Sequence, residues 1–154
     1  MAYNNIKFGI TAIRVLSFSY QDPREIINDF NPENYPLEAK TNVNYRWNIN
    51  KNFFAILLKI QYLIKDSNKE TVELLSLSFT AEYTVENLAE IFHVKSNIDF
   101  EMNRELELTF LGIAISTGRG ILYEKTKGTV FNNFIYPIIN PQDLILSKQN
   151  RSNI

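Results

Sequence analysis

Few residues in this sequence have the types and spacing that catalysis or metal binding requires. The chain of 154 residues contains one histidine, His93, and no cysteine. Thiolate zinc sites, histidine metal clusters and thiol nucleophiles are therefore excluded. Glu82, Glu86 and Glu90 are spaced four apart, but Glu82 lies in a predicted strand, so we interpret them as a solvated edge. We expect a protein that is not an enzyme, in which His93 has a structural role.

Segments that could bind phosphate or nucleic acid lack the required context. Gly118-Arg119-Gly120 lies inside a helical pattern, whereas a dinucleotide fingerprint lies between a strand and a helix. Residues 125–129 have the residue types of a P-loop in a different order, which is typical of a helix end. Tyr45 and Arg46 could form part of an aromatic, basic surface for nucleic acid, but adjacent side chains point to opposite faces of a strand. The net charge of −1 attracts neither nucleic acid nor anionic membrane. We expect no cofactor, no metal and no nucleic-acid partner.

The composition is typical of a soluble globular domain. Hydrophobic residues make up 45% of the chain and charged residues 21%. No apolar run approaches the roughly 20 residues that span a bilayer, and the first ten residues lack the apolar run of a signal peptide. We expect a cytoplasmic protein with no membrane insertion. It should have a single domain over residues 1–147 and a flexible tail over residues 148–154.

Alternation of apolar and polar residues predicts an antiparallel sheet in the first half. Over residues 37–49 the odd positions are mostly apolar and the even positions polar, which is the period of a half-buried strand. Residues 54–64 and 75–85 continue the pattern after short polar turns, as in a meander. An earlier strand is expected over residues 6–20. Its alternation changes phase near Ala12, which predicts a bulge there.

The first strand is separated from the meander by a long crossover. Residues 21–36 contain three prolines and are too many for a hairpin turn. Ile26, Ile27, Phe30 and Tyr35 make this segment too apolar for a flexible linker. We expect other parts of the chain to cover these side chains.

The second half has a helical period. Over residues 104–125, apolar residues fall in two adjacent stripes, which predicts a helix of about 22 residues with a wide apolar face. Gly128 is typical of the C′ position after a helix. A face this wide is more than one sheet covers, so we expect helix-on-helix packing between subunits. The residues assigned to that interface are Phe110, Ala114, Thr117, Gly118 and Ile121.

A short helix is expected at the end of the domain. Asn140 is a good N-cap and Pro141 suits the first helical position, so the helix should run from Pro141 to about Ser147. Residues 87–100 fit either a helix or a strand. The whole order predicts an α+β fold: a four-stranded antiparallel sheet with a long crossover after its first strand, then a long helix and a short C-terminal helix.

This order resembles the SecB family of ATP-independent chaperones. The resemblance is carried by three segments: residues 128–133 (Gly-Thr-Val-Phe-Asn-Asn), 137–141 (Pro-Ile-Ile-Asn-Pro) and 143–144 (Asp-Leu). They are similar to the segment in which the long helix of that family ends in Gly-Thr and a loop with proline and asparagine leads to a short lid helix. Residues 10–18 resemble the family's first strand. The resemblance covers about residues 6–147.

The resemblance implies a homo-oligomeric holdase, a dimer of dimers that keeps clients unfolded for export. Clients would bind in apolar grooves between sheet and helices, roofed by the crossover and the lid helix. The partners it implies are unfolded polypeptides and the translocase motor or an antitoxin. The client-binding residues it implies are Phe30, Tyr35, Phe131, Phe134, Tyr136 and Leu144.

Two alternatives stay open. One is a SecB-like chaperone dedicated to a single partner such as an antitoxin, because residues 75–78 (Leu-Ser-Leu-Ser) lack the acid that the family places there for docking the motor. The other is a small-ligand-binding α+β domain, which predicts a closed pocket with convergent polar groups. The client and the choice between dimer and tetramer are also left open.

Overall fold

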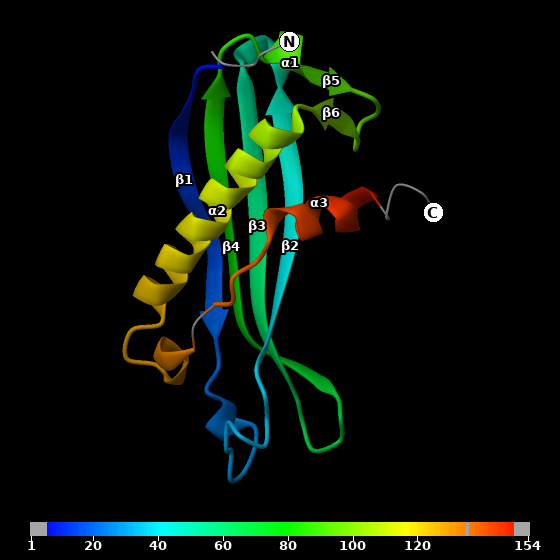
Figure 1. Ribbon diagram of the computed structural model, residues 1–154. Helices are drawn as coiled ribbons and strands as arrows, with labels where there is room; N and C mark the ends of the chain where they lie inside the picture. The colour runs from blue at the N-terminus through cyan, green and yellow to red at the C-terminus, as the bar shows by residue number, and fades with distance from the viewer. Residues whose placement is uncertain (1–5, 135, 150–154) are drawn as a thin grey trace.

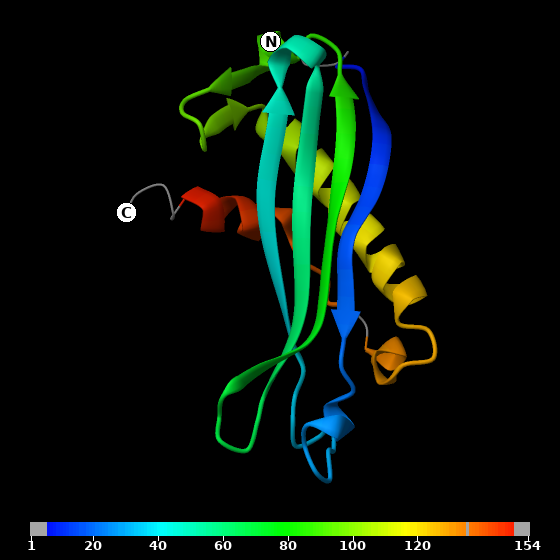
Figure 2. The same ribbon diagram turned by 180° about the vertical axis from the view of Figure 1, so that it is seen from behind.

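The computed structural model describes residues 6–134 and 136–149. A four-stranded antiparallel sheet is crossed diagonally on one face by the long helix α2, and its other face carries no helix (Figures 1 and 2). This is the α+β arrangement that the sequence predicts. The strands, in their order across the sheet, are β1 (Phe8–Tyr20), β4 (Thr71–Val85), β3 (Phe53–Lys65) and β2 (Glu38–Asn48).

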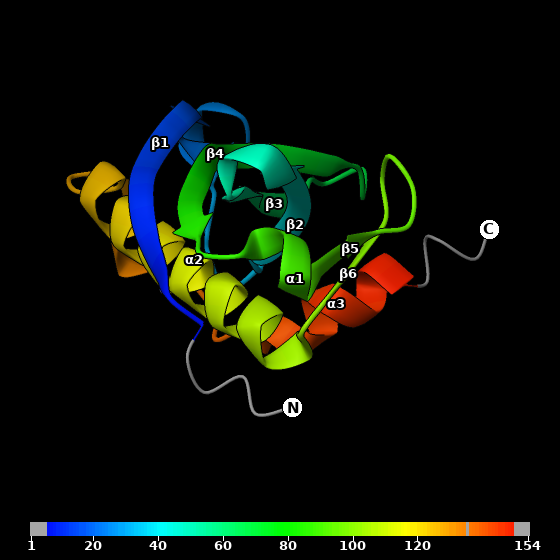
Figure 3. The same cartoon turned by 90° about the horizontal axis from the view of Figure 1, so that it is seen from above.

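The remaining elements lie at the two ends of the sheet and beside α2. Residues 87–100, which the sequence left open, form a short helix followed by a small hairpin that projects beyond β2 (Figure 3). Helix α3 ends at Gln149, two residues after its predicted end, and residues 150–154 lie outside the described residues. In chain order these elements are η1 (Pro23–Glu25), η2 (Ile49–Lys51), α1 (Leu88–Ile91), β5 (Phe92–Val94), β6 (Phe100–Met102), α2 (Arg104–Lys125), η3 (Val130–Asn133) and α3 (Pro141–Gln149).

Strand β1 is an edge strand with two irregularities. Its pairing with β4 shifts between Ile10 and Ala12, which confirms the predicted bulge, and shifts again between Val15 and Ser17. The strand begins at Phe8, two residues later than expected. Because β1 is paired on one side only, its other side presents unpaired backbone groups.

The core lies between α2 and the inner face of β3 and β4. Alternate residues of both strands are fully buried there, among them Ile60 and Phe79. Gly118 of α2 lies so close to the sheet that a Cβ atom on it would be 3.0 Å from side-chain atoms of both residues. Beyond this contact, the β5–β6 hairpin extends the core with stacked aromatic rings. The ring centroids of Phe92 and Phe100 are 4.7 Å apart.

Part of the predicted subunit interface is instead the internal core of the chain. Phe110, Ala114 and Gly118 are buried against the chain's own sheet, so they offer no surface to a second helix. Thr117 and Ile121 are half-buried, and their role in assembly stays a prediction. The physical reason is that the sheet covers most of both apolar stripes of α2. Among the described residues, no helix is both long and apolar enough to cross a membrane.

Candidate functional site

An open groove of about 480 Å³ lies where the crossover between β1 and β2 meets η3. Phe30, Pro32 and Tyr35 line it from the crossover, Leu74 from β4, and the segment 130–134 from the opposite side. We call this site the aromatic groove. Two segments about 100 residues apart in the sequence therefore form one largely apolar surface.

The crossover is held against the sheet by its own hydrogen bonds and by one buried side chain. The backbone of Gln21 donates to the carbonyl of Leu74 at 2.8 Å, and the Gln21 amide donates to the carbonyl of Glu73 at 2.7 Å. Ile27 is buried in the core. Asn31 accepts a hydrogen bond from the backbone of Glu33 at 3.0 Å, which is the Asx turn that Asn-Pro sequences favour. These contacts make the crossover a defined wall of the groove.

The opposite wall depends on how α2 ends. Thr126 caps the helix, and its hydroxyl donates to the carbonyl of Leu122 at 2.7 Å. Gly128 has φ +77°, a conformation that favours glycine. It was predicted at C′, but α2 has its C-cap at Thr126, so Gly128 lies one residue further along, after the C′ residue Lys127. The Thr129 hydroxyl then accepts from the backbone of Phe131 at 3.2 Å and begins η3. This sharp reversal carries Phe131 and Phe134 back over the sheet.

Four of the six predicted client-binding residues line the aromatic groove: Phe30, Tyr35, Phe131 and Phe134. The rings of Phe30 and Tyr35 are stacked with centroids 5.8 Å apart, and both side chains are half-buried. Phe131 is 3% exposed and belongs to the floor of the groove. The structure brings these four residues together, and their role in binding stays a prediction.

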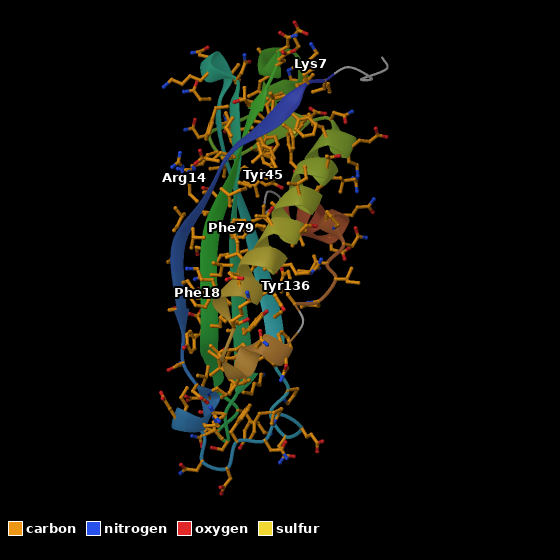
Figure 4. All side chains as sticks on the ribbon, turned by 90° about the vertical axis from the view of Figure 1, so that its left-hand side faces the viewer. Lys7, Arg14, Phe18, Tyr45, Phe79 and Tyr136 are labelled. Atoms are coloured by element: carbon orange, nitrogen blue, oxygen red, sulfur yellow. The ribbon has the colours of Figure 1, made fainter. Side chains whose placement is uncertain are left out.

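Tyr136 and Leu144 lie outside this groove. Tyr136 is 2% exposed, and its hydroxyl is hydrogen-bonded to Thr41 of β2. It lines a neighbouring pocket, on the helix side of the sheet (Figure 4). Leu144 is half-buried on α3 and lines neither cavity. The structure therefore separates these two residues from the four that share the aromatic groove.

The charge in the groove is balanced locally. Arg24 is the charged residue in its lining, and its guanidinium hydrogen-bonds the carboxylate of Asp22, which caps η1. These hydrogen bonds lower the pKa of Asp22 to about 2. The groove therefore offers a neutral apolar surface, suited to aromatic and aliphatic groups.

Pro23, Leu37 and Leu74 also line the groove, and the sequence did not single them out. Leu37 is the first residue of the predicted alternating strand, and Pro23 opens the crossover, so both carry a local signal. Leu74 carries none, because it is out of phase with the alternation of Leu75, Leu77 and Phe79. It is nevertheless buried in the core, since the pairing of β4 with β3 shifts at this point. Its place in the groove depends on the crossover folding under the end of the sheet.

Polar chemistry elsewhere is sparse. His93 is exposed on β5, and no cluster of three metal-ligating side chains occurs in the described part of the chain. Glu107 is buried in the first turns of α2, and its Oε1 has no hydrogen-bond partner there. Burial and the neighbouring Glu107 carboxylate raise the pKa of Tyr45, whose hydroxyl hydrogen-bonds that carboxylate. This pair lies away from the aromatic groove.

No protein-family model matches the chain. The comparison with curated proteins finds no match either. Among solved structures, this chain is similar to the SecB-like chaperone of Mycobacterium tuberculosis, which was solved in complex with a ChAD peptide from the HigA1 antitoxin. The TM-score is 0.55 and the sequence identity 12%, and the alignment covers 86% of this chain and 90% of that chain. A protein of unknown function from Streptococcus agalactiae aligns with a TM-score of 0.40 and 11% identity, over 88% of this chain and 97% of that one. The first likeness shows that this chain has a SecB-like fold.

Proposed function

We propose that this chain is a non-enzymatic chaperone that binds unfolded polypeptide segments in the aromatic groove. The observation that carries the proposal is the groove itself: stacked, half-buried rings on the crossover face the aromatic wall formed by residues 130–134. Apolar side chains of a client would bury surface there at about 25 cal/mol per Å². The groove is open and mostly apolar, which fits a polypeptide better than a small polar ligand.

The SecB-like neighbour supports the proposal, since that protein is a chaperone and was solved with an antitoxin peptide bound. Three variants of this function are a holdase for many clients, a chaperone that delivers clients for export, and a chaperone for a single partner such as an antitoxin. Apart from Arg24, which Asp22 neutralises, and the amide of Asn133, the described lining of the groove is aromatic or aliphatic. Such a surface imposes little sequence selectivity, and this favours a general holdase. We propose that it acts in the cytoplasm.

We further propose that the chain acts as a homo-oligomer joined through β1. Six apolar side chains of this edge strand are between 39% and 57% exposed. Long exposed apolar edge strands pair readily with another strand, and natural proteins cover them. Figure 4 views this edge directly, with Phe18 and Arg14 labelled on β1. A second copy paired along this edge would cover the strip and would bring two aromatic grooves into one particle, so that weak sites act together.

The proposal is tested by light scattering from a slowly refolding, aggregation-prone protein, with and without this chain and without nucleotide. Phe30→Ser removes one ring of the stacked pair, and Ile98→Ser is the matched control because Ile98 is 86% exposed on the hairpin, outside the groove. We expect suppression by the wild type and by Ile98→Ser, with marked loss in Phe30→Ser. No suppression by the folded wild type would contradict a general holdase, and equal suppression by all three would contradict the groove.

A further inference from the structure

A second pocket of about 860 Å³ lies beside the aromatic groove, between α2, the sheet at Tyr62, and η3 with the loop that follows it. Arg119 is the one charged side chain among its described lining residues. Ser116 and Tyr123 contribute hydroxyls from the same helix, and Asn132 and Asn133 contribute amides from η3. We call it the Arg119 pocket. Its lining residues include no acid, so it offers hydrogen-bond donors and one cation.

The Arg119 guanidinium is held in place without being neutralised. Its Nη2 donates to the carbonyl of Pro137 at 3.2 Å, and its Cζ lies 5.9 Å from the centroid of the Tyr136 ring. None of the ion pairs among the described residues involves Arg119. A guanidinium has five N–H donors in a rigid fork that matches a carboxylate. Most of these donors therefore remain available to a ligand.

The two cavities adjoin each other, since Asn133 and Phe134 line both. A polypeptide whose apolar side chains occupy the aromatic groove can therefore extend into the Arg119 pocket. We propose that Arg119 binds a carboxylate of that polypeptide, from an acidic side chain or from its C-terminus. The inference rests on the proposed function and adds the chemical class of segment that the site prefers: aromatic residues followed by a negative charge.

The experiment measures binding of fluorescently labelled peptides to the full chain by anisotropy. Each peptide carries a pair of aromatic residues and one Glu or Gln, placed at a series of distances along the peptide from that pair. All these peptides have an amidated C-terminus. One further Gln peptide has a free C-terminal carboxylate. Arg119→Gln removes the charge but keeps a donor for the Pro137 carbonyl, and circular dichroism checks its folding. Charge-assisted hydrogen bonds are about twice as strong as neutral ones.

We expect the wild type to bind a Glu peptide or the free-carboxylate peptide about tenfold more tightly than the amidated Gln peptide. Arg119→Gln should abolish that preference, and its effect on the affinity for the amidated Gln peptide should be much smaller than its effect on the carboxylate peptides. Preference for Glu identifies a side chain as the source, and preference for the free terminus identifies the C-terminus.

Three results would overturn the inference. Equal affinities of the wild type for all the peptides would show that no carboxylate is recognised. An equal loss for all peptides in Arg119→Gln would assign Arg119 a structural role only. Binding of inorganic phosphate to the wild type without any preference among the peptides would identify a free-anion site. If no peptide binds the wild type at all, the proposed function fails as well. Peptide binding without a carboxylate preference contradicts only the role of Arg119, so the two failures are distinguished.

Discussion

Gly118→Ala tests how closely α2 packs on the sheet. An alanine in the middle of a helix is favoured over glycine by about 0.5–1 kcal/mol. Here, however, the new Cβ would lie 3.0 Å from Ile60 Cδ1 and from Phe79 Cε1 and Cζ. Carbon atoms in good contact are about 3.5–4.0 Å apart, so these groups would have to give way by a few tenths of an ångström.

Such movement is costly because Ile60 and Phe79 are both fully buried on the two central strands. Overpacking a core of this kind costs about 1–3 kcal/mol. After subtracting the gain in helix propensity, we expect Gly118→Ala to lower the free energy of unfolding by about 0.5–2 kcal/mol. Urea denaturation followed by circular dichroism measures this change.

Gly112→Ala is the matched control, because nothing lies within 4 Å of its Cβ position in the same helix. It should raise the free energy of unfolding by about 0.5–1 kcal/mol. The reasoning is refuted if Gly118→Ala stabilises the chain as much as Gly112→Ala does. A loss that grows on dilution of the protein would point instead to packing between subunits, as the sequence suggested for Gly118.

Three further predictions concern other parts of the chain. Burial raises the pKa of Tyr45, Tyr62, Tyr83 and Tyr136, so the folded chain keeps protons that the unfolded chain releases above about pH 10. Stability should be level below that pH and fall above it; a thermal midpoint that stays level to about pH 11 would contradict the burial of these hydroxyls. Tyr45→Phe removes a hydrogen bond to the buried Glu107 carboxylate and should lower the free energy of unfolding, measured by urea denaturation, by about 1–3 kcal/mol. The same substitution should lower it by less in a Glu107→Leu background, and an equal loss there would contradict the pairing of Tyr45 with Glu107. Val15→Lys places a charge on the β1 edge and should shift the particle to a smaller mass in light scattering after gel filtration, whereas Ile98→Lys should not; an unchanged mass for Val15→Lys would exclude β1 as the interface.

Most of the fold follows from local pattern. The helix over residues 104–125 was predicted with its observed bounds, since helical spacing, flanking lysines and Gly128 agree there. The strands were predicted to within a few residues, because apolar and polar residues alternate along most of their length. The β1 bulge was found for the same reason: a change of phase in alternation is visible in sequence.

What the sequence could not supply depends on contacts between distant segments. The second apolar stripe of α2 indicates that something covers it, but the pattern does not distinguish the chain's own sheet from another subunit. Phe110 and Gly118 were assigned to an interface for that reason. The short β5–β6 hairpin was missed because three-residue strands carry too little periodicity. The Arg119 pocket arises only when the loop after η3 folds back onto α2.

The central claim is that an unfolded polypeptide lies in the aromatic groove. The most direct measurement places a photoreactive benzoylphenylalanine at Tyr35, on the groove, or at Lys51, which is exposed in η2 at the opposite end of the sheet (Figure 1). Each variant is irradiated with a permanently unfolded client. The account predicts strong cross-linking from position 35 and only background from position 51. Equal cross-linking from both positions would contradict binding in the aromatic groove. So would the absence of cross-linking from position 35 in a protein that still binds the client.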